Sequence, residues 1–153
     1  MKKVLALMLA SVFVSPLAGA AEAVPVAEVV VDRDGAELRE RLAQPDVDAF
    51  DTAFVFSNRS AVRAAVVCHG FDHAGTPVGR VRVVVPANGL RFALASDLGD
   101  GADFLGRVDC ATGNLGVIGS AFLLGAPGIE NLPVASSVTR RVQTMTIPVT
   151  LTR

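Results

Sequence analysis

Alternating apolar and polar positions dominate the chain from residue 52 onward. The segment 62–69 places four apolar side chains on one face, namely Val62, Ala64, Val66 and Cys68. In the segment 80–85, Val81, Val83 and Val85 share one face, opposite Arg80 and Arg82. A repeat of two residues is the pattern of a half-buried β-strand. Because turn-forming residues occupy 72–77 between the two segments, we predict that they pair as a β-hairpin.

Further strands are predicted where runs rich in Val and Phe lie between clusters of Gly, Pro, Asn and Asp. These segments are 26–31, 52–57, 91–95, 104–110, 115–124 and 144–152. In the last of them the apolar face consists of Met145, Ile147, Val149 and Leu151. Phe92 and Leu94 are expected to point inward, and residues 125–133 to form a loop. Since Pro148 has no N–H to donate, the C-terminal strand is predicted at a sheet edge.

The order of these elements predicts a single all-β domain. One short helix is predicted at 36–43, where Leu38 and Leu42 are a helical turn apart and Pro45 ends the pattern. About seven to nine short strands with frequent turns are typical of a two-sheet, mostly antiparallel Ig-like β-sandwich. A small barrel is the alternative.

The first 23 residues have the order of a cleavable secretory signal peptide. Two lysines precede the apolar run 4–14, which is well short of the ~20 residues that a transmembrane helix needs. Small residues then allow cleavage after Ala20 or after Ala23. We therefore expect a mature domain of residues 24–153, with no membrane span after cleavage, in the periplasm or secreted.

The composition argues against several classes of ligand. The net charge is −1, the only lysines lie in the signal segment, and the arginines are spread along the chain with acids among them, so no nucleic-acid surface is expected. The chain has no Trp and no Tyr, which commonly stack on sugars and bases. With 51% hydrophobic residues, a chain of this length can bury a core without a cofactor.

Cys68 and Cys110 are predicted to form a disulfide. Both belong to the part of the chain expected to reach an oxidising compartment, where paired cysteines are usually bridged. Both also fall on the apolar faces of their strands. Because the two strands are not consecutive, we expect them in different sheets, with the bridge joining the sheets. Two buried free thiols are the alternative.

The two histidines of the chain raise the question of a metal site. With Cys68 and Asp72, His69 and His73 bring several metal-ligand types together at short spacing. The same residues have the composition of a hairpin loop, and a disulfide would remove the Cys68 thiolate. We therefore expect solvated turn residues and no bound metal, and we keep the metal site as the alternative.

Three aspartates between glycines offer a second set of possible ligands. Asp97, Asp100 and Asp103 carry oxygen ligands of the kind that Ca²⁺ prefers. They lack the spacing of an EF-hand loop and its terminal Glu. Such clusters between strands usually form turns, so calcium binding is again the alternative to a solvated loop.

No arrangement of residues predicts an enzyme. A nucleophilic serine would need a base, and the imidazoles on offer are those of His69 and His73. Ser120 lacks the second glycine of a nucleophile elbow. Acidic pairs occur only among turn residues, so no glycosidase acid and base are visible. Without catalytic residues, the expected function is a non-catalytic one.

Several turns and strands together resemble a known group of proteins. The matching parts are the strand end Ser57-Asn58, the hairpin 70–75, the turn 86–89 and the Gly-rich strand 116–119. In these features the chain is similar to small bacterial β-sandwich proteins such as the sensory rhodopsin transducer and secreted Ig-like or fibronectin-like domains. The resemblance implies an Ig-like fold and no particular function.

These observations predict an exported β-sandwich that acts as a protein-interaction or structural module. A protein partner would dock on a sheet face or add to an edge strand. A small metal- or calcium-binding exported protein is the alternative function.

Overall fold

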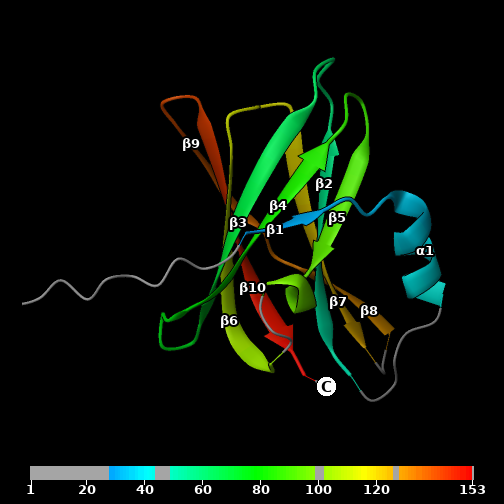
Figure 1. Ribbon diagram of the computed structural model, residues 1–153, viewed down its shortest axis with the longest axis vertical. Helices are drawn as coiled ribbons and strands as arrows, with labels where there is room; N and C mark the ends of the chain where they lie inside the picture. The colour runs from blue at the N-terminus through cyan, green and yellow to red at the C-terminus, as the bar shows by residue number, and fades with distance from the viewer. Residues whose placement is uncertain (1–27, 44–48, 99–101, 126–127, 153) are drawn as a thin grey trace, which may run out of the picture.

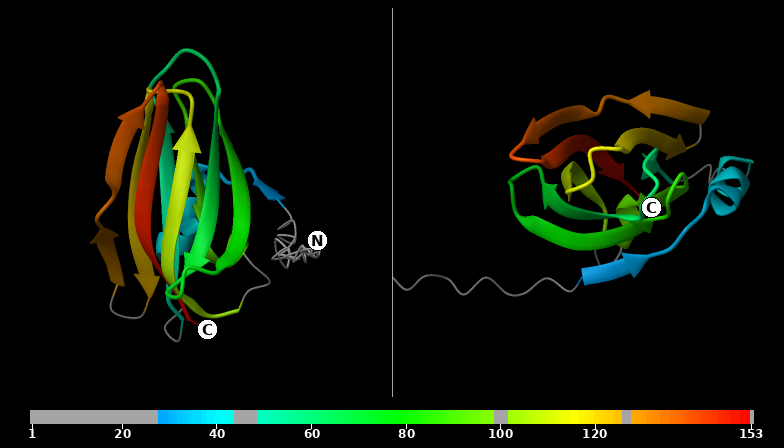
Figure 2. Two further views of the ribbon diagram at one scale, coloured as in Figure 1. Left: turned by 90° about the vertical axis from the view of Figure 1, so that its left-hand side faces the viewer. Right: turned by 90° about the horizontal axis from the view of Figure 1, so that it is seen from above.

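The chain folds as a two-sheet β-sandwich, as the sequence predicts (Figure 1, Figure 2). The structure, a computed structural model, describes residues 28–43, 49–98, 102–125 and 128–152. These residues form ten strands, one α-helix and one short 3-10 helix. The predicted signal peptide, residues 1–23, lies outside the described residues. In the described parts of the chain, no helix is long and apolar enough to cross a membrane.

The larger sheet has six strands. In spatial order they are β1 (Glu28–Val31), β4 (Pro77–Val85), β3 (Ala64–Asp72), β6 (Phe104–Thr112), β10 (Val142–Leu151) and β9 (Ala135–Thr139). β1 and β4 run parallel, and the other neighbours are antiparallel. The predicted hairpin is confirmed as β3 and β4, with the turn where the Asp, Gly and Pro residues indicated it.

The smaller sheet has four strands. They are β5 (Leu90–Leu94), β2 (Asp51–Asn58), β7 (Val117–Gly125) and β8 (Gly128–Leu132). The prediction of a loop over 125–133 is wrong, because β8 lies within that segment and pairs with β7. Ile129, Glu130 and Asn131 are all exposed, so β8 shows no alternating burial. Its backbone pairs with β7, and Leu132 at its end packs against the main core.

The main core lies between the sheets and includes the predicted apolar faces. Phe54 and Phe56 of β2 are fully buried in this core. So are Val81, Val83 and Val85 of β4. The C-terminal strand buries its predicted face as well, namely Met145, Ile147, Val149 and Leu151. Val62 is the exception, because it lies before the start of β3 and is exposed.

A second core lies on the outer face of the smaller sheet. Phe92 and Leu94 are buried as predicted, but they point away from the larger sheet and pack under Leu38 of the helix α1 (Gly35–Ala43). Asp34 begins this helix, with its Oδ1 accepting the backbone N–H groups of Ala36 and Glu37. The helix therefore makes β2 an apolar strand buried on both faces.

The disulfide joins Cys68 and Cys110, but its predicted position between the sheets is wrong. β3 and β6 are neighbours in the larger sheet, and the two cysteines are directly opposite each other, with Cα atoms 3.9 Å apart. β3 and β6 are neighbours in the sheet although β4, β5 and η1 (Ala95–Asp97) lie between them in the sequence. The bridge is thus a cross-strand link within one sheet.

The prediction that the C-terminal strand lies at a sheet edge is also wrong. β10 is flanked by β6 and β9. The pairing with β9 ends at Thr146, however, and the backbone N–H of Thr150 points away from β6 to the hydroxyl of Thr52. Alternation along the strand directs the missing N–H of Pro148 to the same side, beyond the end of β9. Proline is tolerated because β10 is locally an edge there.

The C-terminal end of β10 also reaches the smaller sheet. Phe50 and Thr152 exchange both backbone hydrogen bonds, at 3.0 and 2.9 Å. The Thr52 hydroxyl in turn donates to the Thr150 carbonyl at 3.0 Å. These bonds hold the end of β10 against the start of β2, so this end of the sandwich is fixed where the candidate site lies.

Candidate functional site

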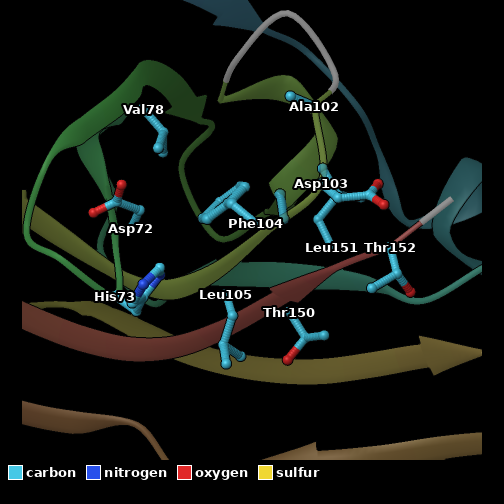
Figure 3. A pocket seen from close by; sticks show the side chains of 11 residues that line it. Asp72, His73, Val78, Ala102, Asp103, Phe104, Leu105, Thr150, Leu151 and Thr152 are labelled. Carbon is cyan, nitrogen blue, oxygen red and sulfur yellow. The ribbon is translucent and has the colours of Figure 1, made fainter.

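The candidate site is a cavity of about 780 Å³ at the end of the sandwich near the C-terminus (Figure 3). Its walls come from the β3–β4 turn, the start of β6 and the end of β10. The residues that line it are Asp72, His73, Val78, Ala95, Ala102, Asp103, Phe104, Leu105, Thr150, Leu151 and Thr152. This volume is within the usual range for small-molecule sites.

The β3–β4 turn supplies the polar wall of the cavity. Asp72 Oδ1 accepts the backbone N–H groups of Ala74 and Thr76, at 2.9 and 2.8 Å. Gly75 follows with a φ of 83°, a conformation that glycine adopts without strain. The bonds from Thr76 and Ala74 lower the pKa of Asp72 below its ordinary value. The carboxylate therefore stays ionised while it holds the turn in shape.

A close backbone contact positions the opposite wall. The 3-10 helix η1 (Ala95–Asp97) and the following Leu98 lie against β4, and a Cβ atom on Gly79 would fall only 0.9 Å from the Leu98 carbonyl oxygen. Only glycine allows this approach. Leu98 is buried, with its backbone N–H bonded to the Ala95 carbonyl at 3.0 Å. η1 is thereby held at the cavity, where Ala95 forms part of the lining.

Three of the residues singled out from the sequence meet at this cavity. Asp72 and His73 come from the β3–β4 turn, and Asp103 comes from the segment that leads into β6. In Figure 3 the ring of Phe104 lies between the side that carries Asp72 and the side that carries Asp103. His73 and Asp103 are exposed, whereas Phe104 is half-buried and packs against the main core.

His69 is not part of this group. It lies on the outer face of the larger sheet, exposed, opposite Arg80 on one side and Asp109 on the other. Asp109 already accepts hydrogen bonds from Arg107 Nε and the Thr146 hydroxyl, at 3.1 and 2.8 Å. The strand places His69 on a charged, solvated face, and the turn carries His73 away from it.

The three aspartates proposed for calcium do not form a shared site in the described residues. Asp97 forms an ion pair with Arg33. Its carboxylate also accepts the backbone N–H of Leu94, the residue before η1, at 2.8 Å, and so stabilises the start of that 3-10 helix. Asp103 lines the cavity instead. Asp100 lies outside the described residues. Over the part of the chain that the structure describes, no three His, Cys, Asp or Glu side chains are close enough together to hold a metal ion.

The sequence reasoning missed a half-buried carboxyl group next to η1. Asp51 begins β2, and its two oxygens accept the hydroxyl and the backbone N–H of Ser96, at 2.7 and 3.3 Å. Burial is the main cause that raises its pKa, and the nearby Asp97 charge adds to it, against the hydrogen bonds from Ser96. The signal was an acid two residues before the wholly apolar run 53–56. Asp51 does not line the cavity.

A second missed feature is the free edge formed by β9. All five of its residues are exposed, and its sequence Ala-Ser-Ser-Val-Thr carries no charge and no proline. A two-residue turn joins it to β10, since Thr139 pairs directly with Val142. Its β-branched residues next to a predicted strand were the signal for a hairpin.

No family model, no curated protein and no solved structure matches this chain. The resemblance to the sensory rhodopsin transducer and to secreted Ig-like domains therefore stays an expectation.

Proposed function

We propose that the protein is an exported, non-catalytic interaction module that binds a protein partner by accepting a β-strand along β9. The observation that carries this proposal is the exposed and uncharged edge of that strand. An unprotected edge offers backbone N–H and C=O groups to another chain.

Comparison of the four sheet edges supports the choice of β9. β1 carries Glu28, which pairs with Arg80 at 2.9 Å, and β8 carries Glu130. β5 lies beside α1, and Phe92 of this strand donates its backbone N–H to the Arg33 carbonyl. Charges and covering segments of this kind protect sheet edges against added strands. Over the described residues, β9 is the edge that has neither.

The register shows which backbone groups of β9 are free to bind. Thr139 and Val142 close the two-residue turn as a hydrogen-bonded pair, so the odd-numbered residues of β9 face β10. Ser136 and Val138 consequently direct their N–H and C=O groups to the open side. A partner strand would bond to these two residues.

The non-catalytic part of the proposal rests on the sequence, in which no nucleophile with a base and no pair of catalytic carboxyl groups is visible. The carboxyl group with the raised pKa, Asp51, lies outside the cavity lining. The alternative function, metal or calcium binding, has no group of three metal-ligating side chains behind it among the described residues.

Site-specific photo-crosslinking in producing cells tests the strand-addition proposal. A benzophenone side chain at Val138 should give a discrete adduct with another polypeptide, whereas the same group at the exposed Ser120 of β7 should not. Ser136→Pro should abolish the adduct, because it removes a free N–H without touching the β10 ladder. Ser136→Thr is the matched control. An adduct that survives Ser136→Pro, or no adduct at all, would refute the proposal.

Export is tested separately by the mass of the protein outside the cytoplasm. Signal peptidase needs small side chains before the cleaved bond, so the mature chain should begin at Ala21 or at Val24. Recovery of exported protein that still carries Lys2 and Lys3 would contradict cleavage.

A further inference from the structure

We propose that the cavity at the C-terminal end of the sandwich binds a small organic cation with an apolar body. This site is separate from the β9 edge, whose hairpin tip lies toward the opposite end of the molecule (Figure 1). The inference therefore does not rest on the strand-addition proposal.

The floor of the cavity selects for an apolar body. Val78 and Phe104 are half-buried, and Leu151 is only 3% exposed. These side chains converge from β4, β6 and β10, so the apolar surface is built from three strands of one sheet. Burying an apolar ligand against it would remove apolar surface from water, which stabilises a complex by about 25 cal/mol per Å².

The charges at the mouth select for a cation. The described lining contains two carboxylates, those of Asp72 and Asp103, one imidazole, that of the exposed His73, and no Lys or Arg. Arg107, on the neighbouring outer face, stacks over the Phe71 ring at 5.0 Å and pairs with Asp109 at 3.1 Å. Arg107 thus has an aromatic and an acidic partner outside the described lining. The described lining leaves a negative potential that attracts cations and disfavours anions.

Phe104 can contact both the apolar body and the cationic head group of such a ligand. Its ring lies between the two acidic sides of the cavity in Figure 3, and it is the one aromatic residue in the described lining. The face of an aromatic ring attracts an ammonium group, and nearby carboxylates add to that attraction. A quaternary alkylammonium ion combines this head group with an apolar tail. The same set of side chains does not suit a bare metal ion, which needs several converging ligands.

The test uses octyltrimethylammonium and octyl sulfate, both below their micelle concentrations, with amide and methyl NMR shifts as the readout. The cation should shift Val78, Phe104 and Leu151, and should bind roughly tenfold tighter than the anion, as expected from about 1.4 kcal/mol of electrostatic discrimination. Asp103→Asn should weaken binding of the cation about threefold. Glu130→Gln, which removes an exposed carboxylate on β8, should leave it unchanged.

Two further variants separate ligand contact from loss of fold. Asp72→Asn removes the charge but keeps the oxygen that accepts the turn N–H groups, so folding should persist while binding of the cation weakens. Val78→Trp should fill the cavity and abolish binding, with circular dichroism as the check on folding. The proposal is overturned if neither probe shifts these residues, if the anion binds as tightly as the cation, or if Glu130→Gln weakens binding as much as Asp103→Asn.

Discussion

At the scale of single residues, Asp51 illustrates how burial and hydrogen bonds have opposite effects on the pKa of a carboxyl group. Burial removes its carboxylate from water, while the Ser96 hydroxyl and N–H partly replace that water. Because burial is the larger effect, the pKa is raised above 3.8 in the folded protein. The folded state then holds the proton more tightly than the unfolded chain does. The contribution of Asp51 to the free energy of unfolding therefore falls as the pH rises from 3.8, the ordinary pKa, through the higher pKa of the folded state.

We predict that Asp51→Asn raises the melting temperature at neutral pH. The asparagine keeps an oxygen for Ser96 and removes the cost of a half-buried charge. Well below pH 3.8 the wild-type carboxyl is protonated in both the folded and the unfolded state, so the difference in melting temperature should shrink. Thermal unfolding at several pH values measures this. Glu130→Gln is the control, and a neutral-pH melting temperature that falls in Asp51→Asn would contradict the assigned cause.

Asn58 shows the structural use of a buried amide at the other end of β2. It is 1% exposed, and its Nδ2 donates to the Val62 and Pro86 carbonyls at 2.7 and 3.0 Å. Its Oδ1 accepts both the N–H and the hydroxyl of Ser60, at 3.0 and 2.8 Å. One side chain thus satisfies the backbone of two connecting turns.

We expect Asn58→Ala to destabilise the protein by about 2–3 kcal/mol, because buried carbonyls and an N–H lose their partners. Chemical denaturation gives the value. Asn131→Ala, at an exposed position of β8, should change stability by less than about 0.5 kcal/mol. Equal effects of the two substitutions would show that the Asn58 bonds add nothing.

At the scale of elements, the β9–β10 hairpin is closed by an unusual pair of residues. Arg140 and Arg141 have φ values of 50° and 67°, both in the left-handed region. Positive φ at both central positions defines a type I′ turn, which favours Asn-Gly. Side chains with a Cβ are strained there. The two arginines are exposed, and no ion pair involves them among the described residues.

The double change Arg140→Asn with Arg141→Gly should therefore raise the free energy of unfolding by about 1 kcal/mol, through relief of backbone strain. The opposite change, Arg140→Ile with Arg141→Val, places β-branched residues at positive φ and should lower it. Urea unfolding of both variants measures the effect. If the Asn-Gly variant is the less stable one, the turn does not adopt this conformation.

At the scale of the whole molecule, the disulfide ties together strands that are distant in sequence. Cys68 and Cys110 are 42 residues apart and almost fully buried in the centre of the larger sheet. A bridge across such a loop restricts the unfolded chain by roughly 4 kcal/mol in the chain-entropy model.

We predict that replacing both cysteines with alanine lowers the free energy of unfolding by roughly that amount, about 4 kcal/mol. Reduction of the wild-type protein should likewise lower its melting temperature. The native, unreduced protein should not react with iodoacetamide. Alkylation of two thiols in the native protein would show that the bridge is absent.

Repeating patterns within the chain determined much of this fold. Strict alternation identified the buried faces of β4 and β10, because a strand alternates its side chains between two faces whatever its neighbours are. Turn residues located the β3–β4 hairpin, and Asp72 proved to be the residue whose side chain holds that turn. The pairing of the two cysteines also followed from their number and their apolar strand faces.

Only the tertiary structure decided which strands became neighbours. It placed Cys68 and Cys110 in one sheet, gave Pro148 a locally unpaired side within β10, and turned Phe92 toward the helix. Likewise, Asp72 and Asp103 share a cavity only because β3 and β6 lie side by side. Local sequence determines the face and the turn of each strand, whereas strand order depends on packing between residues far apart in the chain. That packing leaves no periodic signal in the sequence.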